Sequence, residues 1–165
     1  MNDDRYILVI ADGSPEMNVA LEYACARSKK TGRKIIIATF IEPLDVLTTQ
    51  GVTEIMKNEA REEAERILQS AASIVKESTG AMPILHTREG ELIFELKKLI
   101  EEEEKIHVLV LAANANEKEK DPGPIIHSLV TKEISNLRIP VMIVPGNLSK
   151  AVSYTHLTLP TKRIV

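Results

Sequence analysis

The chain has 165 residues, the size of one ordinary domain, and its 44% hydrophobic and 27% charged content excludes disordered and fibrous proteins. The net charge of −3, the absence of tryptophan and an aromatic content of 3% argue against a nucleic-acid binder, which needs cationic and stacking side chains. The longest unbroken apolar run, Val108 to Ala113, is far shorter than the roughly 20 residues of a membrane-spanning helix.

The first residues and the cysteine content bear on where the protein acts. The start, Met-Asn-Asp-Asp-Arg, has no apolar stretch behind a basic segment, so a secretory leader is not expected. The single cysteine, Cys25, cannot form an internal disulfide, which is typical of proteins in reducing compartments. We therefore expect a cytoplasmic protein without a membrane segment.

The chain ends in a segment that matches a translated sequencing adapter. Residues 152–161 read Val-Ser-Tyr-Thr-His-Leu-Thr-Leu-Pro-Thr, as does a translation of the transposon mosaic-end adapter; the alternative is a natural β-like tail. We expect a domain over residues 1–149 and a non-native tail over residues 150–165. Residues 152–165 contain Lys162 and Arg163 and no acidic residue, so without them 19 basic residues stand against 24 acidic ones, a net charge of −5.

The first predicted elements form a β-α-β unit. Tyr6 to Ala11 (YILVIA) is a nearly continuous apolar run, typical of a strand covered on both faces. Residues 12–15 (DGSP) combine a turn with a serine N-cap and a proline at the first helical position, and Gly32 marks the helix end. Lys34 to Phe40 (KIIIATF) is a second buried strand. The two strands should be parallel, with a right-handed crossover.

A long helix and two further strands are expected next. An apolar stripe at helical spacing precedes a terminating Gly80. The stripe consists of Ile55, Met56, Ala60, Ala64, Ile67, Leu68, Ala71 and Val75. Pro83 to Thr87 (PILHT) and His107 to Ala113 (HVLVLAA) are predicted strands, and Gly90-Glu91 opens a helix between them.

The last elements complete an alternating α/β pattern. A helix is predicted from Pro124 to about Leu137. Its inward-facing residues are expected to be Ile126, Leu129, Val130, Ile134 and Leu137. Ile139 to Val144 (IPVMIV) is the fifth strand. No linker or internal repeat divides these elements, so the sequence predicts one doubly wound α/β domain with a mainly parallel sheet.

The turn after the first strand is a candidate binding segment. In doubly wound folds, ligands bind beyond the carboxyl ends of the strands, where the strand order reverses. Ala11-Asp12-Gly13-Ser14 places a carboxylate and a hydroxyl at such an end. Asp12 could accept a hydrogen bond from a ribose hydroxyl or an adenine amine. Alternatively, it is an ordinary turn aspartate, with Gly13 relieving backbone strain.

Several segments together resemble the universal stress protein family. The resemblance rests on the opening ILVIADGS of residues 7–14, ALEYA at 20–24, REGE at 88–91 and IPVMIVP at 139–145, and it extends from residue 6 to about residue 148. It implies a five-stranded parallel sheet in the order 3-2-1-4-5, a Rossmann-like fold similar to that of adenine nucleotide alpha hydrolases.

The resemblance also implies how the protein acts. In this family the fifth strand commonly pairs with its copy in a homodimer, because an exposed sheet edge needs covering. Val141 and Ile143 would then lie in or near the interface, with Met142 on the opposite face. The implied function is that of a non-enzymatic, cytoplasmic stress-response protein acting through protein contacts with partners that the sequence does not name.

The loop after the fourth strand departs from the ATP-binding branch of the family. That branch has Gly, two residues, Gly, nine residues, then Gly with Ser or Thr, whose amides and hydroxyl hold the phosphates. The corresponding positions here are Ala112, Ala115, Ile125 and Ile126, so the glycines and the hydroxyl are absent. An added Cβ can keep the backbone from approaching a phosphate. We expect no cofactor and weak or lost triphosphate binding, with an ATP- or AMP-binding sensor as the alternative.

A candidate nucleotide pocket follows from these two loops. Asp12 and the chain near Ile41 would flank the adenosine, Gly123 gives the second loop some freedom, and His127 begins the last helix. The full set is Ala11, Asp12, Gly13, Ser14, Ile41, Ala112, Ala115, Gly123 and His127.

The sequence contains no recognisable catalytic set. Cys25 lies on or beside the apolar stripe of the first helix and is expected in the core. His86, His107 and His127 lie on or next to different elements without metal-ligand spacing. Ser14 lacks a nucleophile-elbow sequence. We expect no enzymatic activity and no metal site, since an adenylyl-transfer enzyme would need the phosphate loop that is missing.

Overall fold

The structure, a computed structural model, describes residues 4–43, 50–114 and 122–148. Ala115 and the predicted tail, residues 150–165, lie outside the described residues. The division of the chain at residue 149 therefore stays a prediction.

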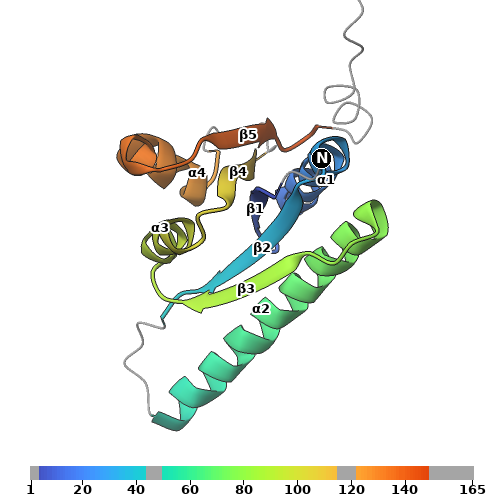
Figure 1. The fold of residues 1–165 in the computed structure, drawn as a ribbon. Coiled ribbons are helices and arrows are strands. Elements are labelled where there is room, and N and C mark those ends of the chain that lie inside the picture. Colours follow the sequence, from blue (N-terminus) through green and yellow to red (C-terminus); the bar gives the residue numbers. More distant parts are fainter. Residues whose placement is uncertain (1–3, 44–49, 115–121, 149–165) are drawn as a thin grey trace, which may run out of the picture.

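Five parallel strands form one sheet in the order β3-β2-β1-β4-β5 (Figure 1). Their bounds are Tyr6–Ile10 for β1, Lys34–Ile41 for β2, Ile84–Glu89 for β3, Ile106–Ala113 for β4 and Val141–Pro145 for β5. The predicted fold class and strand order are confirmed, and the predicted strand ends differ by one or two residues.

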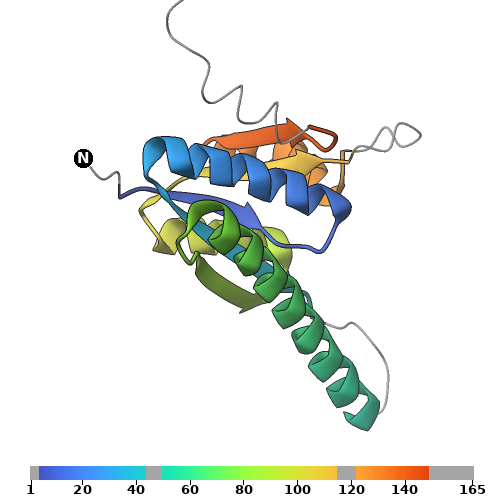
Figure 2. The same cartoon turned by 90° about the vertical axis from the view of Figure 1, so that its right-hand side faces the viewer.

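Helices cover both faces of the sheet, as the connections between parallel strands require. The helices are α1 (Pro15–Thr31), α2 (Gln50–Thr79), α3 (Leu92–Glu102) and α4 (Pro124–Ser128). Figures 1 and 2 show α1 and α2 on one face and α3 and α4 on the other. Each face has its own apolar cluster. Both clusters include alternate residues of β1, so Ile7 through Ile10 are all buried.

The long helix α2 extends beyond the sheet that it covers. Its 30 residues span about 45 Å at 1.5 Å per residue, and its first turns project past the ends of the strands (Figure 2). Ala64, Leu68 and Val75 are buried against the sheet, whereas Ile55 is 59% exposed. The predicted apolar stripe is therefore a core-facing surface only from about Ala60 onward, because the earlier turns lie beyond the strands.

The last helix is shorter and less regular than its sequence indicates. After α4, the chain forms a π-helical segment, η1 (Leu129–Glu133), and a 3₁₀ turn, η2 (Ile134–Asn136). Ile126 and Leu129 are buried as predicted, but Val130 is 48% and Ile134 49% exposed, so the prediction that these two face inward is wrong. A regular helix would have kept all four residues on related faces, and the change in helical pitch removes that relation.

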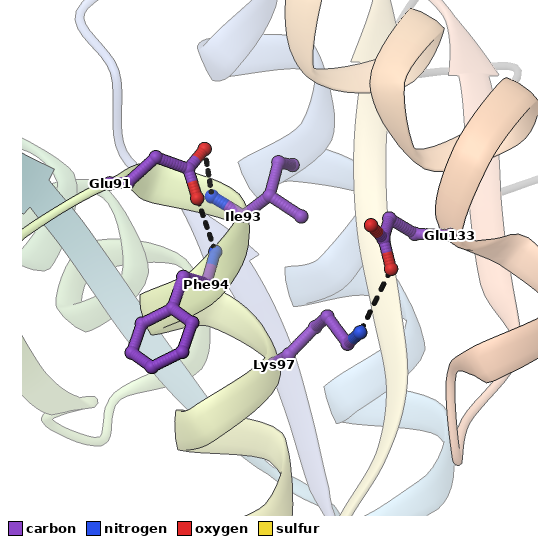
Figure 3. Close-up of polar contacts among 5 residues, drawn as sticks. All are labelled: Glu91, Ile93, Phe94, Lys97 and Glu133. Atoms are coloured by element: carbon purple, nitrogen blue, oxygen red, sulfur yellow. Dashed lines mark hydrogen bonds and ion pairs between the residues drawn. The ribbon is translucent and has the colours of Figure 1, made fainter.

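Two polar contacts accompany this irregular segment. The Thr131 hydroxyl donates to the His127 carbonyl at 2.6 Å, and such back-bonding bends helices. The Lys97 ammonium of α3 contacts the Glu133 carboxylate at 2.9 Å (Figure 3). Figure 3 also shows Glu91, whose carboxylate accepts from the amides of Ile93 and Phe94 and so caps α3. The sequence predicts the start of this helix at Gly90-Glu91, but not the cap.

His107 occupies an irregularity between β1 and β4. Tyr6 pairs with Ile106 and Ile7 with Val108, so His107 is an extra residue on β4. Its Nδ1 donates to the Tyr6 carbonyl at 2.8 Å. This bond fixes Nε2 as an acceptor, which is buried without a hydrogen-bond partner in the described part of the chain.

The surroundings of His107 favour its neutral form. Burial lowers the pKa of His107 below its ordinary value, the bond to the Tyr6 carbonyl raises it, and the charges of three arginines lower it. These arginines are Arg33, Arg5 and Arg27, in order of effect. Because the unfolded chain takes up the proton at a higher pH than the folded chain does, His107 contributes stability that is present above about pH 6.5 and is lost as the pH falls through the folded pKa.

The first prediction concerns this pH dependence. We expect the free energy of unfolding, measured by urea titration between pH 7.5 and 5, to fall as the pH falls. His107→Asn keeps a donor within reach of the Tyr6 carbonyl but does not titrate. In this variant the free energy of unfolding should therefore depend less steeply on pH, so the slope of that free energy against pH should flatten. His127→Gln, at an exposed position on α4, should leave the slope as it is. An unaltered slope in His107→Asn would contradict this account.

Candidate functional site

The turn after β1 is held by the Asp12 carboxylate. One oxygen, Oδ1, accepts from the Ser14 amide at 2.9 Å and from the Ser14 hydroxyl at 2.7 Å. Gly13 has a φ of 76°, in the left-handed region that favours glycine. Ser14 is the N-cap of α1 as predicted, but its side chain makes no capping bond and donates to Asp12. No described residue donates to the second oxygen, Oδ2, which leaves this exposed carboxylate able to accept from a ligand.

A cavity lies between α1, β4 and the start of α4, and we call it the α1–α4 cavity. Its volume is about 330 Å³, within the range of small-molecule sites. Asp12, Ser14, Ala112 and Gly123 line it, so the structure brings together four of the predicted site residues. The other lining residues are Ile10, Pro15, Glu16, Met17, Ala20, Val110, Leu111, Asn114, Pro122, Pro124, Ile125 and Ile126.

A second cavity lies on the other side of Asp12, and we call it the α2–α3 cavity. Its volume is about 300 Å³. Ile10 and Asp12 line both cavities, so the Asp12 turn separates two parts of one groove. Ala11 and Ile41, also predicted site residues, line this second part. Its remaining lining residues are Thr39, Phe40, Glu42, Ala60, Glu63, Ala64, Ile67 and Leu92.

The remaining three predicted site residues are not among the residues that line the two cavities. Gly13 shapes the turn through its φ but lines neither cavity. His127 is exposed on α4 and lines neither cavity. Ala115 falls outside the described residues.

Some lining residues were not predicted. Thr39 and Glu42 lie near the carboxyl end of β2, a position that by itself could have indicated them. Glu63 is not part of the apolar stripe that the sequence predicts for its helix. Glu63 reaches the groove because α2 crosses the ends of the strands. The spacing of apolar residues along this helix does not predict that crossing.

The helix start at the α1–α4 cavity is poorly suited to a phosphate. Pro124, at the first position of α4, has no amide hydrogen, and the next residues are Ile125 and Ile126. The His127 amide donates to the Gly123 carbonyl at 3.0 Å, and the Asn114 amide to the Pro122 carbonyl at 3.0 Å. This part of the groove therefore offers mainly apolar side chains, in line with the missing phosphate loop.

A third hollow, about 370 Å³ in volume, adjoins the α2–α3 cavity and shares Ile41 and Glu42 with it. Arg61 and Glu89 pair there, with Nε to Oε1 at 2.7 Å. The hydrogen bond and charge of Arg61 lower the pKa of Glu89. Lys57 also lines this hollow.

Two further observations concern the described residues. They contain no group of three or more His, Cys, Asp or Glu side chains that could hold a metal ion. None of their helices combines the length and the apolar character needed to cross a bilayer. Cys25 is fully buried in the core, as predicted.

With this geometry established, comparison with known proteins identifies the family. The model of the universal stress protein family matches residues 5–145. The chain belongs to the universal stress protein family, which confirms the resemblance seen in its sequence. No curated protein matches it in sequence.

Solved structures share the fold at low sequence identity. The universal stress protein UspA from Lactobacillus plantarum is 14% identical, with a TM-score of 0.71 over 87% of this chain and 99% of that one. A universal stress protein from Archaeoglobus fulgidus in complex with dAMP is 16% identical, with a TM-score of 0.60 over 87% and 99%. A universal stress protein in complex with cAMP is 20% identical, with a TM-score of 0.60 over 87% and 98%.

The backbone after β5 packs tightly beside the α1–α4 cavity. A Cβ added to Gly146 would overlap the Ala113 carbonyl oxygen and lie 2.8 Å from Glu16 Cγ. The Ala113 oxygen is a backbone atom at the end of β4, so it cannot move aside as a flexible side chain could. This close approach fixes how β5 and α1 meet at the cavity wall.

The second prediction tests this approach. Gly146→Ala should lower the free energy of unfolding by about 1–3 kcal/mol, the usual cost of overpacking. The matched control is Gly51→Ala, at the second residue of α2, where an added Cβ meets open space, and this change should alter the free energy of unfolding by less than about 0.5 kcal/mol. Equal effects of the two variants in urea titrations would show that the contact is not a constraint.

Proposed function

We propose that the protein is a non-enzymatic stress-response protein that senses an adenosine-type ligand in the groove on either side of Asp12. The observation that carries the proposal is the position of Asp12 between two cavities at the carboxyl ends of β1, β2 and β4, with an Oδ2 to which no described residue donates. An adenine amine or a ribose hydroxyl is a donor that this oxygen can accept. The complexes of two structural relatives with dAMP and cAMP support this choice of ligand.

The walls of the groove suit a purine base. Ile10 and Ile41 bring apolar surface to the α2–α3 cavity, and Leu92 and Ile67 face it from the two flanking helices. Apolar walls with a few placed polar groups are typical of small-molecule sites. We assign the base to this part of the groove and the ribose to the neighbourhood of Asp12.

The proposal includes the absence of catalysis. Cys25 is buried in the core, and His107 lies near the amino-terminal ends of β1 and β4, whereas the groove lies at the carboxyl ends of the strands. The Ser14 hydroxyl donates to Asp12, and no histidine lines either cavity among the described residues. Prolonged incubation with ATP and AMP, followed by ³¹P NMR, should show no conversion; stoichiometric or catalytic turnover would overturn this part of the proposal.

The third prediction tests the role of Asp12. Asp12→Asn keeps an oxygen for the Ser14 bonds and replaces the second acceptor with a donor. Loss of a hydrogen bond to a charged group is worth about 1.5–3 kcal/mol, so adenosine affinity measured by calorimetry should fall roughly tenfold or more. Asp4→Asn, at the opposite end of β1, is the matched control and should bind like the parent protein. Equal affinities of the two variants would remove Asp12 from the site.

A second function, assembly through β5, rests on a different observation. β5 pairs with β4 alone, so it is an edge of the described sheet. An unprotected edge is a template for another strand. Ile143 is 40% exposed there, Val141 packs on the α3 side of the sheet, and Met142 packs on the α1 side. We propose that this edge forms a homodimer interface through which the protein makes its contacts.

The fourth prediction concerns this assembly. The protein ending at Ser149 should scatter light as a dimer, and Ile143→Lys should convert it to a monomer, because a charge would be buried in the interface. Met82→Lys alters a 60% exposed methionine before β3 and should leave the dimer intact. A parent protein that is monomeric over a wide concentration range would contradict the assembly.

A further inference from the structure

The inference that follows rests on the proposed function and names the chemical class of its ligand. It begins with the charges that line the groove. Asp12 and Glu16 line the α1–α4 cavity, and Glu42 and Glu63 line the α2–α3 cavity together with Asp12. The described linings of these two cavities contain no lysine or arginine. A ligand in the groove therefore lies among several carboxylates.

The hydrogen-bond donors of the groove give little compensation to a phosphate. The helix at the α1–α4 cavity has only five residues, so it presents a weak dipole. Pro124 lacks an amide hydrogen, and the His127 and Asn114 amides already donate to carbonyl groups. The first turn of α4 therefore offers only the amides of Ile125 and Ile126, whose apolar side chains also line the cavity.

The cations of the adjoining third hollow share it with carboxylates. Lys57 and Arg61 line the third hollow together with Glu42 and Glu89. Arg61 places its Nε and one terminal nitrogen on the two oxygens of Glu89. An anionic group directed toward this hollow would compete with an ion pair that is already formed.

We infer that the groove selects an uncharged nucleoside of the adenosine class over its phosphate esters. A nucleoside places its base on the apolar walls and donates to Asp12 without bringing a negative charge among the carboxylates. A 5′-phosphate adds nearly two negative charges at neutral pH to a groove in which carboxylates repel it.

The test is a comparison of adenosine, AMP and ATP by calorimetry at about 20 mM and 500 mM salt. We expect adenosine to bind about tenfold more tightly than AMP at low salt, and ATP to bind most weakly. The difference in affinity between adenosine and the two phosphate esters should shrink at high salt, where the screening length falls to a few ångströms. The double variant Glu16→Gln, Glu42→Gln should bring the AMP-to-adenosine affinity ratio closer to one.

The outcomes separate this inference from the function on which it rests. AMP binding as tight as adenosine binding, or tighter, would overturn the selectivity and leave the proposed sensor in place. A difference that neither salt nor the double variant changes would overturn its electrostatic cause. No binding of any of the three ligands at millimolar concentration would overturn the sensor itself.

Discussion

The hydrogen bonding of β1 to both β2 and β4 determines where a ligand can bind. β1 is the central strand, and the chain leaves it toward β2 on one side and reaches β4 on the other side only later. At such a reversal the loops from neighbouring strands diverge and leave a crevice at the carboxyl ends. Asp12 follows β1 at this point, which explains why it lines both cavities.

Because the groove lies at the carboxyl ends of the strands, the side chains of the loops there determine which ligand can bind. A parallel sheet buried on both faces leaves few positions for polar side chains except at the strand ends. Here these positions carry Asp12 and Glu42, while α4 begins with Pro124 and two isoleucines. The fold is that of the universal stress proteins, but the groove combines a negative lining with a helix start unsuited to phosphate. An adenosine-type ligand without a phosphate fits this combination.

The sequence predicted those features that depend on neighbouring residues. The apolar run of β1 and the glycine after α1 act locally, and the strand and the helix end that they predict are confirmed. Where tertiary structure decides, prediction failed: Val130 and Ile134 are exposed because the last helix changes pitch, and Ile55 because α2 extends past the sheet. Asp12 was found from its place after a strand, whereas Glu63 approaches the groove only through the crossing of α2 over the strand ends.

The central claim, that the Asp12 groove binds an adenosine-type ligand, is tested most directly by following backbone amide resonances during an adenosine titration. We expect saturable shifts at Ala11, Ser14 and Ala112, which line the groove, and unchanged resonances at Gly32 and Lys105, just before β2 and β4 at the amino-terminal ends of the strands. Shifts confined to the amino-terminal ends of the strands, or none at millimolar adenosine, would contradict the account.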